Sequence, residues 1–404
     1  MRESWRWFGP NDPVTIDDIK QTGATDIVSA LHHIPIGETW SEEAIKDHQK
    51  FIQFTESGES NLSWTVVESI PVHEDIKLGL PGNDIYIENW ISSIENLAKC
   101  GIKTVCYNFM PVIDWTRTDL KYKLPNGAYS LSFDHNKFAA FDLFILKRDN
   151  AKDDYSDKDV SIARDIFNLM SELERKELTN NIIAGLPGRM TESYNIKDFK
   201  TMLGKYKNIS AENLRSNLIS FLSKVLPRCE MLDVKLAIHP DDPPRNLLGL
   251  PRIICTKYDL NMLFSSLPSE SNGMTLCVGT YSSRPDNDIP ELARTFASRI
   301  HFSHLRNVCI DLNEHRSFYE SSHLDGDVDM VEIINELLNE EKRRKSNGLV
   351  NNEIYFRPDH GHLMMDDIHK VVNPGYSKIG RMKALAEIRG VIRALSSDKI
   401  GKSL

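Results

Sequence analysis

The sequence has little cysteine: six residues in a chain of 404, none of them paired as C-x-x-C. This usage excludes a disulfide framework and fits a reducing compartment. No stretch approaches the roughly 18 apolar residues of a membrane span, and residues 1–10 carry charged and aromatic residues where a signal peptide is apolar. We therefore expect a cytoplasmic protein without membrane partners.

The chain also lacks an excess of positive charge, since 49 Lys and Arg face 58 Asp and Glu, giving a formal net charge of −9. A broad phosphate-binding surface is not expected from this balance, so nucleic acid is a poor candidate partner. Internal repeats and low-complexity tracts are missing too. With 40% hydrophobic residues the chain can bury a large core, as one elaborated domain or as two.

Short β-branched or aromatic runs alternate with helical patterns along the chain, which indicates parallel β/α units. Eight such runs are the number that a TIM (β/α)8 barrel needs. We expect strands at residues 5–9, 26–31, 63–69, 103–109, 234–239, 274–279, 299–306 and 353–359.

Apolar residues at helical spacing predict outer helices at residues 87–100, 330–345 and 382–395. More than a hundred residues separate the fourth and fifth strands, with helical stretches at 160–178, 196–206 and 211–226. A segment of this length with such periodicity is too structured to be a linker. We expect one catalytic domain over residues 1–404, with a helical insertion at 110–230 that caps the barrel mouth or forms a subunit contact.

Potential metal ligands end four consecutive predicted strands: His239, Cys277, His304 and Asp359. Barrel enzymes place their chemistry at the carboxyl ends of the strands. A thiolate, two imidazoles and a carboxylate suit a divalent transition metal, and open positions would make the site catalytic. Each residue alone is more often structural, so the prediction depends on their joint placement.

Alternation along a strand places residues two apart on the same face. If His304 and Asp359 point into the barrel mouth, Arg306 and Arg357 do so as well. Two arginines near a metal could hold a substrate carboxylate through paired hydrogen bonds. Asn108 and Arg117, from the loop after the fourth strand, are further candidates for substrate hydroxyl and carboxylate contacts.

Several segments together resemble the mannonate dehydratase family, in the family's order and over nearly the whole chain. They begin at Trp5 (WRWFGPNDPV), Ala30 (ALHHIP), Val67 (VESIPVHEDIK), Thr104 (TVCYNFMPVIDWTRTDL), Asn181 (NIIAGLPG), Ile238 (IHPDDPPRNLLGLPRI), His323 (HLDGDVDM), Arg357 (RPDHGH) and Asn373 (NPGYSKIGR). The resemblance implies an elaborated, xylose-isomerase-like TIM barrel, a hydro-lyase that converts D-mannonate to 2-dehydro-3-deoxy-D-gluconate in glucuronate catabolism, and Mn(2+) or Fe(2+) as cofactor.

The same resemblance implies that His239, Cys277, His304 and Asp359 bind the metal and that His360 and Tyr376 are catalytic. We expect Tyr376 to remove the proton at C2 and His360 to protonate the departing hydroxyl, with the reverse assignment open. A tyrosine base needs a lowered pKa, which the metal or a nearby arginine, Arg381 or Arg357, could provide. Fold analogy suggests a homo-oligomer.

Three other functions stay open at this point. A metal-dependent sugar isomerase or epimerase would use the same barrel, although a thiolate ligand suits hard metals such as Mg(2+) poorly. A phosphodiesterase would need more ligands and a basic surface. A barrel without activity, kept for binding, would have no reason to retain His360 and Tyr376.

Overall fold

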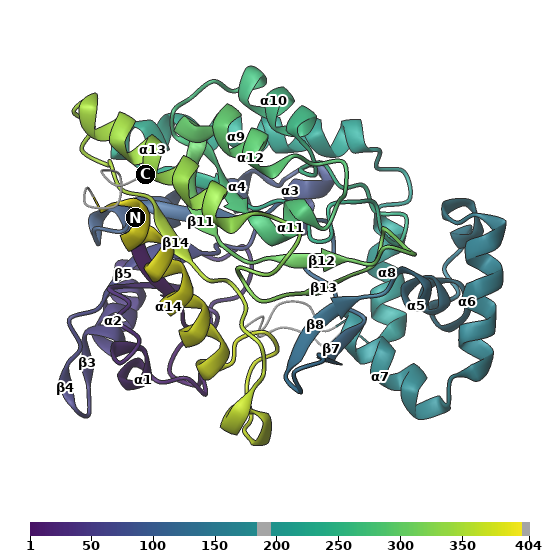
Figure 1. Ribbon diagram of the computed structural model, residues 1–404. Coiled ribbons are helices and arrows are strands. Elements are labelled where there is room, and N and C mark those ends of the chain that lie inside the picture. The colour runs from purple at the N-terminus through teal and green to yellow at the C-terminus, as the bar shows by residue number, and fades with distance from the viewer. Residues whose placement is uncertain (184–194, 398–404) are drawn as a thin grey trace.

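The computed structural model describes residues 1–183 and 195–397, and its centre is a closed barrel of eight parallel strands (Figure 1). Around the barrel the strands follow the order β1-β14-β11-β10-β9-β6-β5-β2. The predicted barrel is confirmed, and each of the eight predicted runs contributes a strand. They are β1 (Arg2–Arg6), β2 (Asp26–Ser29), β5 (Ser63–Glu68), β6 (Thr104–Tyr107), β9 (Lys235–Ile238), β10 (Asn272–Cys277), β11 (Ile300–His304) and β14 (Tyr355–Arg357).

The first strand begins and ends three residues earlier than the range predicted for it, residues 5–9. Trp5 and Arg6 pair with Ile27 and Val28 of β2, which makes Arg6 the last residue of β1. Beyond this point the backbone turns away, because the Phe8 amide donates to the Asp12 carboxylate and Gly9 adopts a φ of +102°. The two Trp residues misled the prediction, since Trp7 already lies past the strand.

A layer of side chains fills the barrel interior below its mouth. Val28, Val66, Cys106, Ala237 and Phe302, from five different strands, form one fully buried cluster. Ala237 and Phe302 precede His239 and His304 by two residues, so alternation carries the two histidines to the same inner face one layer higher.

Helices cover the outside of the barrel and share one large apolar core with the outward faces of the strands. The three predicted outer helices are confirmed as α4, α13 and α14, and α14 begins four residues earlier than predicted. The helices here are α1 (Ile16–Lys20), α2 (Glu42–Gln53), α3 (Glu74–Leu78), α4 (Asp84–Lys99), α9 (Ala211–Leu232), α10 (Lys257–Ser266), α11 (Val278–Ser282), α12 (Ile289–Thr295), η3 (Ala297–Arg299), α13 (Met330–Ser346), η4 (Met365–His369) and α14 (Lys378–Leu395).

Between β6 and β9 the chain extends to one side of the barrel, where Figure 1 shows most of these elements at the right. The stretch predicted as one helix over 160–178 is two helices, because Ser171 starts a new one: its hydroxyl accepts from the Glu174 amide, and the Glu174 carboxylate accepts from the Ser171 amide. The elements before α9 are β7 (Asp119–Lys123), β8 (Tyr129–Phe133), α5 (His135–Ala140), η1 (Phe141–Leu146), η2 (Ala151–Asp154), α6 (Asp157–Leu169), α7 (Glu172–Ile183) and α8 (Ile196–Lys205). In the motif at 181–188, residues 184–188 lie outside the described residues.

A second sheet, which the sequence did not predict, joins this segment to the chain between β11 and β14. β12 (Val308–Ile310) and β13 (Phe318–Glu320) pair antiparallel with each other, and β13 pairs with β8 in the order β12-β13-β8-β7. Phe133 and Phe318 stack across the sheet within a second apolar core. This pairing brings Glu320, the last residue of β13, to the barrel mouth. A two-stranded hairpin, β3 (Phe54–Thr55) and β4 (Gly58–Glu59), completes the strands.

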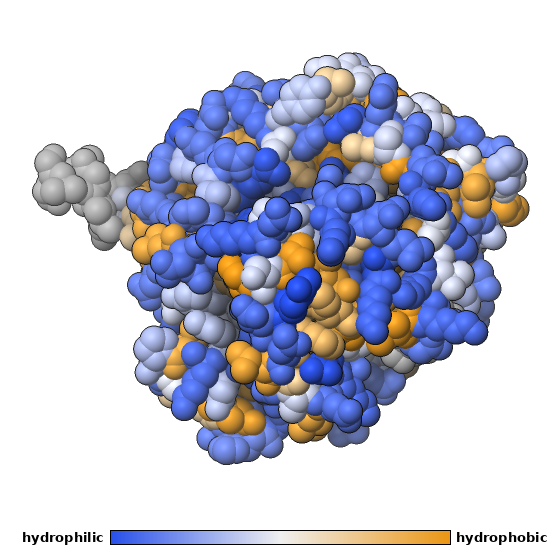
Figure 2. Space-filling model, turned by 90° about the vertical axis from the view of Figure 1, so that its right-hand side faces the viewer, coloured by the Kyte–Doolittle hydropathy of each residue, from blue (hydrophilic) through white to orange (hydrophobic). Residues whose placement is uncertain are grey.

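The surface is mainly polar. Figure 2 shows hydrophilic side chains over most of one face, with apolar residues in separate small patches. Within residues 1–183 and 195–397, no helix combines the length and apolarity that crossing a bilayer demands.

Candidate active site

The carboxyl ends of the barrel strands surround a cavity of about 930 Å³, counting the part open to solvent. This is the end of the barrel where such folds hold their ligands. Most of the predicted site residues line it: Asn108, His239, Arg306, Arg357, Asp359, His360 and Tyr376. Cys277 and His304 are fully buried beside it.

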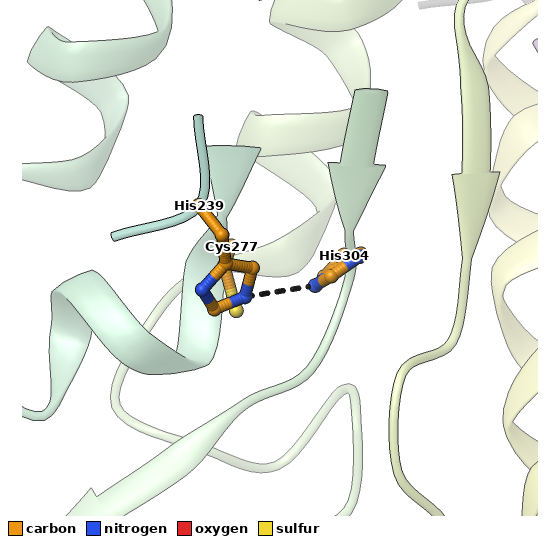
Figure 3. A group of neighbouring side chains, drawn as sticks. All are labelled: His239, Cys277 and His304. Atoms are coloured by element: carbon orange, nitrogen blue, oxygen red, sulfur yellow. Dashed lines mark hydrogen bonds between the residues drawn. The ribbon is translucent and has the colours of Figure 1, made fainter. Parts of the chain in front are cut away.

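His239, Cys277 and His304 converge from the ends of three neighbouring strands (Figure 3). Their donor atoms lie within 4.8 Å of one another, and His239 Nε2 is 3.2 Å from His304 Nδ1. Donors that each bind one ion at about 2.0–2.3 Å have a similar spread. The three residues can therefore share one metal ion.

The protonation of His239 suits this role. Burial lowers the pKa of its imidazole, so the neutral form is favoured. His239 Nδ1 lies 2.7 Å from the Pro240 carbonyl and donates its proton there. The lone pair of the neutral ring is then on Nε2, which faces His304, as a metal-ligating histidine requires.

Asp359 is close to two members of this group. Its carboxylate lies 3.8 Å from Cys277 Sγ and 3.9 Å from His304 Nδ1. Burial opposes its charge, but His360, Arg357 and His304 hold the pKa of Asp359 well below its usual range. The sequence predicted Asp359 as the fourth donor, and its charged carboxylate lies beside Cys277 and His304, although the donors that lie within 4.8 Å of one another are those of His239, Cys277 and His304.

A second group of potential donors, Glu68, Cys106 and His304, lies on the other side of the His304 ring. It is less suited to a metal, because burial raises the pKa of the Cys106 thiol well above its usual range and only the thiolate binds metals. Glu68 is already engaged by two hydrogen bonds from Arg357. His304 Nε2 is buried with no hydrogen-bond partner and lies 3.5 Å from Glu68 Oε1. The other ring nitrogen, Nδ1, faces His239 and Asp359 and is the one placed to bind a metal.

Arginines and carboxylates form a buried network around the cavity. Arg306 donates to Asp242 at 3.0 Å and to Glu320 at 2.9 Å. Arg117 donates to the same two carboxylates at 2.7 and 3.0 Å and is fully buried behind Arg306, away from the residues that line the cavity. Arg357 bridges Glu68 and Asp359. The predicted carboxylate-binding arginines thus have protein carboxylates as partners.

His360 is oriented by Glu320. Its Nδ1 lies 2.8 Å from Glu320 Oε2, and its Nε2 lies 3.7 Å from Asp359 Oδ1. Although burial opposes ionisation, His360 and Arg306 lower the pKa of Glu320 to about 2, so the carboxylate is charged and accepts from Nδ1. The other ring nitrogen is left for proton transfer at the cavity.

Tyr376 packs against His360, with ring centroids 5.0 Å apart, and makes a T-shaped contact with Phe8. Burial raises the pKa of the phenol, while Arg357 and Arg6 act in the opposite direction. The phenol therefore keeps its proton near neutral pH until a further positive charge comes close.

Asn108 follows β6 directly and is partly exposed at the cavity wall. Its side-chain oxygen accepts from the Met110 amide at 3.3 Å, which leaves the amide nitrogen for a ligand.

Sequence reasoning missed three residues of this site. Asp242 and Glu320 accept hydrogen bonds from Arg306, and neither residue ends a barrel strand. The one sequence feature that pointed to either was the closeness of Asp242 to His239 in the segment HPDDPP. Arg6 was counted only among the polar residues at strand ends, for which a supporting or loop role was expected, and it was not chosen as a site residue. Its position at the end of β1 is the signal that could have found it.

Fold and site together define a TIM-barrel enzyme whose cavity combines a set of metal donors with a paired histidine and tyrosine. The model of the D-mannonate dehydratase (UxuA) family matches residues 1–402. The chain belongs to this family of hydro-lyases, which confirms the family expected from the sequence motifs.

Individual relatives agree with this assignment over the full length. The chain is 50% identical over 397 residues to the mannonate dehydratases of Brucella melitensis biotype 2 and of Brucella canis, with 98% of each chain covered. The crystal structure of mannonate dehydratase from Streptococcus suis serotype 2 matches at 34% identity with a TM-score of 0.74, covering 98% of this chain and 93% of the other.

Proposed function

We propose that the protein removes water from D-mannonate to give 2-dehydro-3-deoxy-D-gluconate. The observation that carries this proposal is full-length similarity to mannonate dehydratases, in a chain whose metal donors, His360 and Tyr376 gather at one cavity. The reaction fits a place in glucuronate catabolism.

Two steps of this reaction are hard in water: removing a proton next to a carboxylate, and expelling hydroxide. His239, Cys277, His304 and Asp359 would hold Mn(2+) or Fe(2+), for which their mixed sulfur, nitrogen and oxygen donors are suited. When bound, such an ion acts as a Lewis acid and stabilises the negative charge that develops on the substrate.

The chain itself supplies the proton transfers. In our proposal Tyr376 takes the proton from C2, and Arg357 together with Arg6 favours its phenolate. His360, held by Glu320, gives a proton to the leaving hydroxyl at Nε2. In the reverse assignment His360 Nε2 takes the proton from C2 and the Tyr376 phenol gives its proton to the leaving hydroxyl.

The remaining predicted contacts divide into two kinds. Asn108 and Arg306 line the cavity, and we propose that Asn108 binds a substrate hydroxyl while Arg306 contributes positive charge at the wall. Arg117 is better placed to hold Asp242 and Glu320 than to touch substrate.

At the level of the whole chain, we propose one catalytic domain over residues 1–404, with 110–230 as an insertion between the fourth and fifth barrel strands that caps the mouth or forms a subunit contact. We further propose that the protein is a cytoplasmic homo-oligomer. Light scattering on the purified protein measures the oligomer directly, and a mass of one chain would refute that part.

The decisive test of function is an assay for the 2-keto-3-deoxy acid. Purified, chelator-stripped protein is incubated with D-mannonate, with and without added Mn(2+) or Fe(2+). We expect product only with metal. Bound metal without product would favour the sugar isomerase or epimerase reading and a screen of aldoses and ketoses.

A further inference from the structure

Arg6 differs from every other arginine at the cavity. It is the last residue of β1, lines the cavity and is 6% exposed. Its Nη2 lies 3.2 Å from His32 Nε2, while Nη1 is buried and has no hydrogen-bond partner. No carboxylate of residues 1–183 or 195–397 forms an ion pair with it.

The neighbouring arginines have the carboxylate partners that Arg6 lacks. Arg117, Arg306 and Arg357 each have two carboxylate partners at 3.0 Å or less. A buried guanidinium without such a partner loses hydration and gains little in return, which is costly for the ligand-free protein.

Burial lowers the pKa of Arg6, and Glu68 favours its charge without forming an ion pair with it. Burial, and then Arg6 itself, hold the pKa of His32 well below its usual range, so the imidazole is neutral and accepts from Nη2. Phe8 contributes its ring face, 4.7 Å from the guanidinium carbon. Arg381 donates to the Arg6 carbonyl at 2.7 Å and fixes the backbone. The side chain is thus held in place with one donor directed at no protein acceptor.

We propose that Arg6 binds the carboxylate of the sugar-acid substrate. The proposal rests on the proposed function and deepens it, because it names the group that recognises the acid end of the substrate. Arg306 and Arg357, the arginines first expected to do this, are occupied by protein carboxylates.

The location of Arg6 agrees with the chemistry. Phe8 lies 4.7 Å from the Arg6 guanidinium carbon, measured to its ring centroid, and makes a T-shaped contact with the Tyr376 ring, with centroids 4.7 Å apart. A carboxylate held at Arg6 would therefore place the adjoining C2 carbon on the side of the cavity where Tyr376 lies. The carbon that loses its proton is the one next to the carboxylate.

The test compares a charged and an uncharged ligand on the chelator-stripped protein, so that no metal contributes to binding. D-Mannonate and D-mannitol, which has an alcohol in place of the carboxylate, are titrated calorimetrically into wild type, Arg6→Gln and Arg6→Lys. Arg294→Gln is the matched control, since Arg294 is an exposed arginine paired with Glu332.

We expect Arg6→Gln to weaken D-mannonate binding by about 10- to 100-fold and to leave D-mannitol binding unchanged. Arg6→Lys should recover part of the loss, because it keeps the charge but not the two parallel donors. The melting temperature of the ligand-free Arg6→Gln protein should equal or exceed that of wild type, since no internal ion pair is removed.

Three results would overturn the proposal: equal D-mannonate affinity in Arg6→Gln, no binding to the stripped wild type at millimolar ligand, or a melting temperature lowered as by loss of a structural ion pair. If the protein does not dehydrate D-mannonate but Arg6 still binds carboxylates, the binding and activity measurements differ from these three results. Sugar acids would then bind in an Arg6-dependent way, with no dehydration of D-mannonate when metal is present.

Discussion

His304 has different neighbours on its two ring nitrogens. Nδ1 faces His239 and Asp359, whereas Nε2 faces Glu68 at 3.5 Å. If Nδ1 binds the metal, the proton is on Nε2 and can be donated to Glu68. Carboxylates in this position orient metal-ligating histidines and raise their basicity.

We therefore expect Glu68→Gln to weaken metal binding by about 10- to 100-fold, measured by competition with a fluorescent chelator. Glu3→Gln is the control, because Glu3 also forms a bidentate pair with an arginine, Arg389, but lies outside the site. An unchanged metal affinity in Glu68→Gln would show that Glu68 serves Arg357 alone.

The two assignments of acid and base differ in which variant still exchanges the C2 hydrogen. If Tyr376 is the base, metal-loaded His360→Asn in D2O incorporates deuterium at C2 while forming product at least about 100-fold more slowly, and Tyr376→Phe incorporates none. The reverse assignment gives the opposite pattern, read by NMR of recovered D-mannonate. Exchange in both variants would contradict either role.

The candidate site could be predicted in part because its ligands are the last polar residues of continuous apolar runs. Each of these ligands is the last residue of a barrel strand or follows it directly: His239, Cys277 and His304. An error of one or two residues in the predicted strand bounds therefore did not alter the choice of ligands. Arg6 was missed because its run is short and rich in Trp. Glu320 could not be found, since a distant pairing places it.

β13 carries Glu320 to the barrel, and its residue Phe318 is part of the second apolar core. Phe318 is 3% exposed and stacks on Phe133, whereas Tyr319, on the opposite face, is partly exposed. We expect Phe318→Ala to lower the free energy of unfolding by about 3–5 kcal/mol and Tyr319→Ala by about 1 kcal/mol, in urea titrations. Equal losses would mean that the second sheet does not depend on its buried face.

The same variant tests the link between this sheet and the site. Glu320 is two residues from Phe318 and orients His360. Under conditions where the protein stays folded, Phe318→Ala should therefore lower kcat while changing KM by a smaller factor. Tyr319→Ala should leave both close to wild type.

The barrel was predictable because most of its strands are short, largely buried runs that alternate with helical periodicity, a pattern set by local sequence. β7, β8, β12 and β13 gave no such pattern. They are short, β7 is largely exposed, and the pairing of β8 with β13 joins residues more than a hundred positions apart in the chain. The break between α6 and α7 was lost for a different reason, since a single capping serine causes it.

For the molecule as a whole, buried histidines make stability depend on pH. Burial lowers the pKa of His48, His135 and His323 to about 4. Between about pH 6.5 and pH 4 the unfolded chain binds protons at these residues and the folded protein does not. The free energy of unfolding should therefore fall as the pH falls through this window, by up to about 1.4 kcal/mol per pH unit for each histidine.

Below that window the carboxylates add to the loss. Glu320, whose pKa is lowered to about 2, contributes stability that is present above its ordinary pKa of about 4.3 and disappears as the pH falls toward 2. Urea midpoints between pH 7.5 and 5 separate the histidines from this second effect. His135→Leu should reduce the dependence of the unfolding free energy on pH by the equivalent of about one proton. His135 suits this substitution because neither of its ring nitrogens has a hydrogen-bond partner to lose. As the control, His369→Gln replaces an exposed histidine and should leave this pH dependence unchanged. An unfolding free energy that stays constant down to pH 5 would show that the buried rings take up protons in the folded protein.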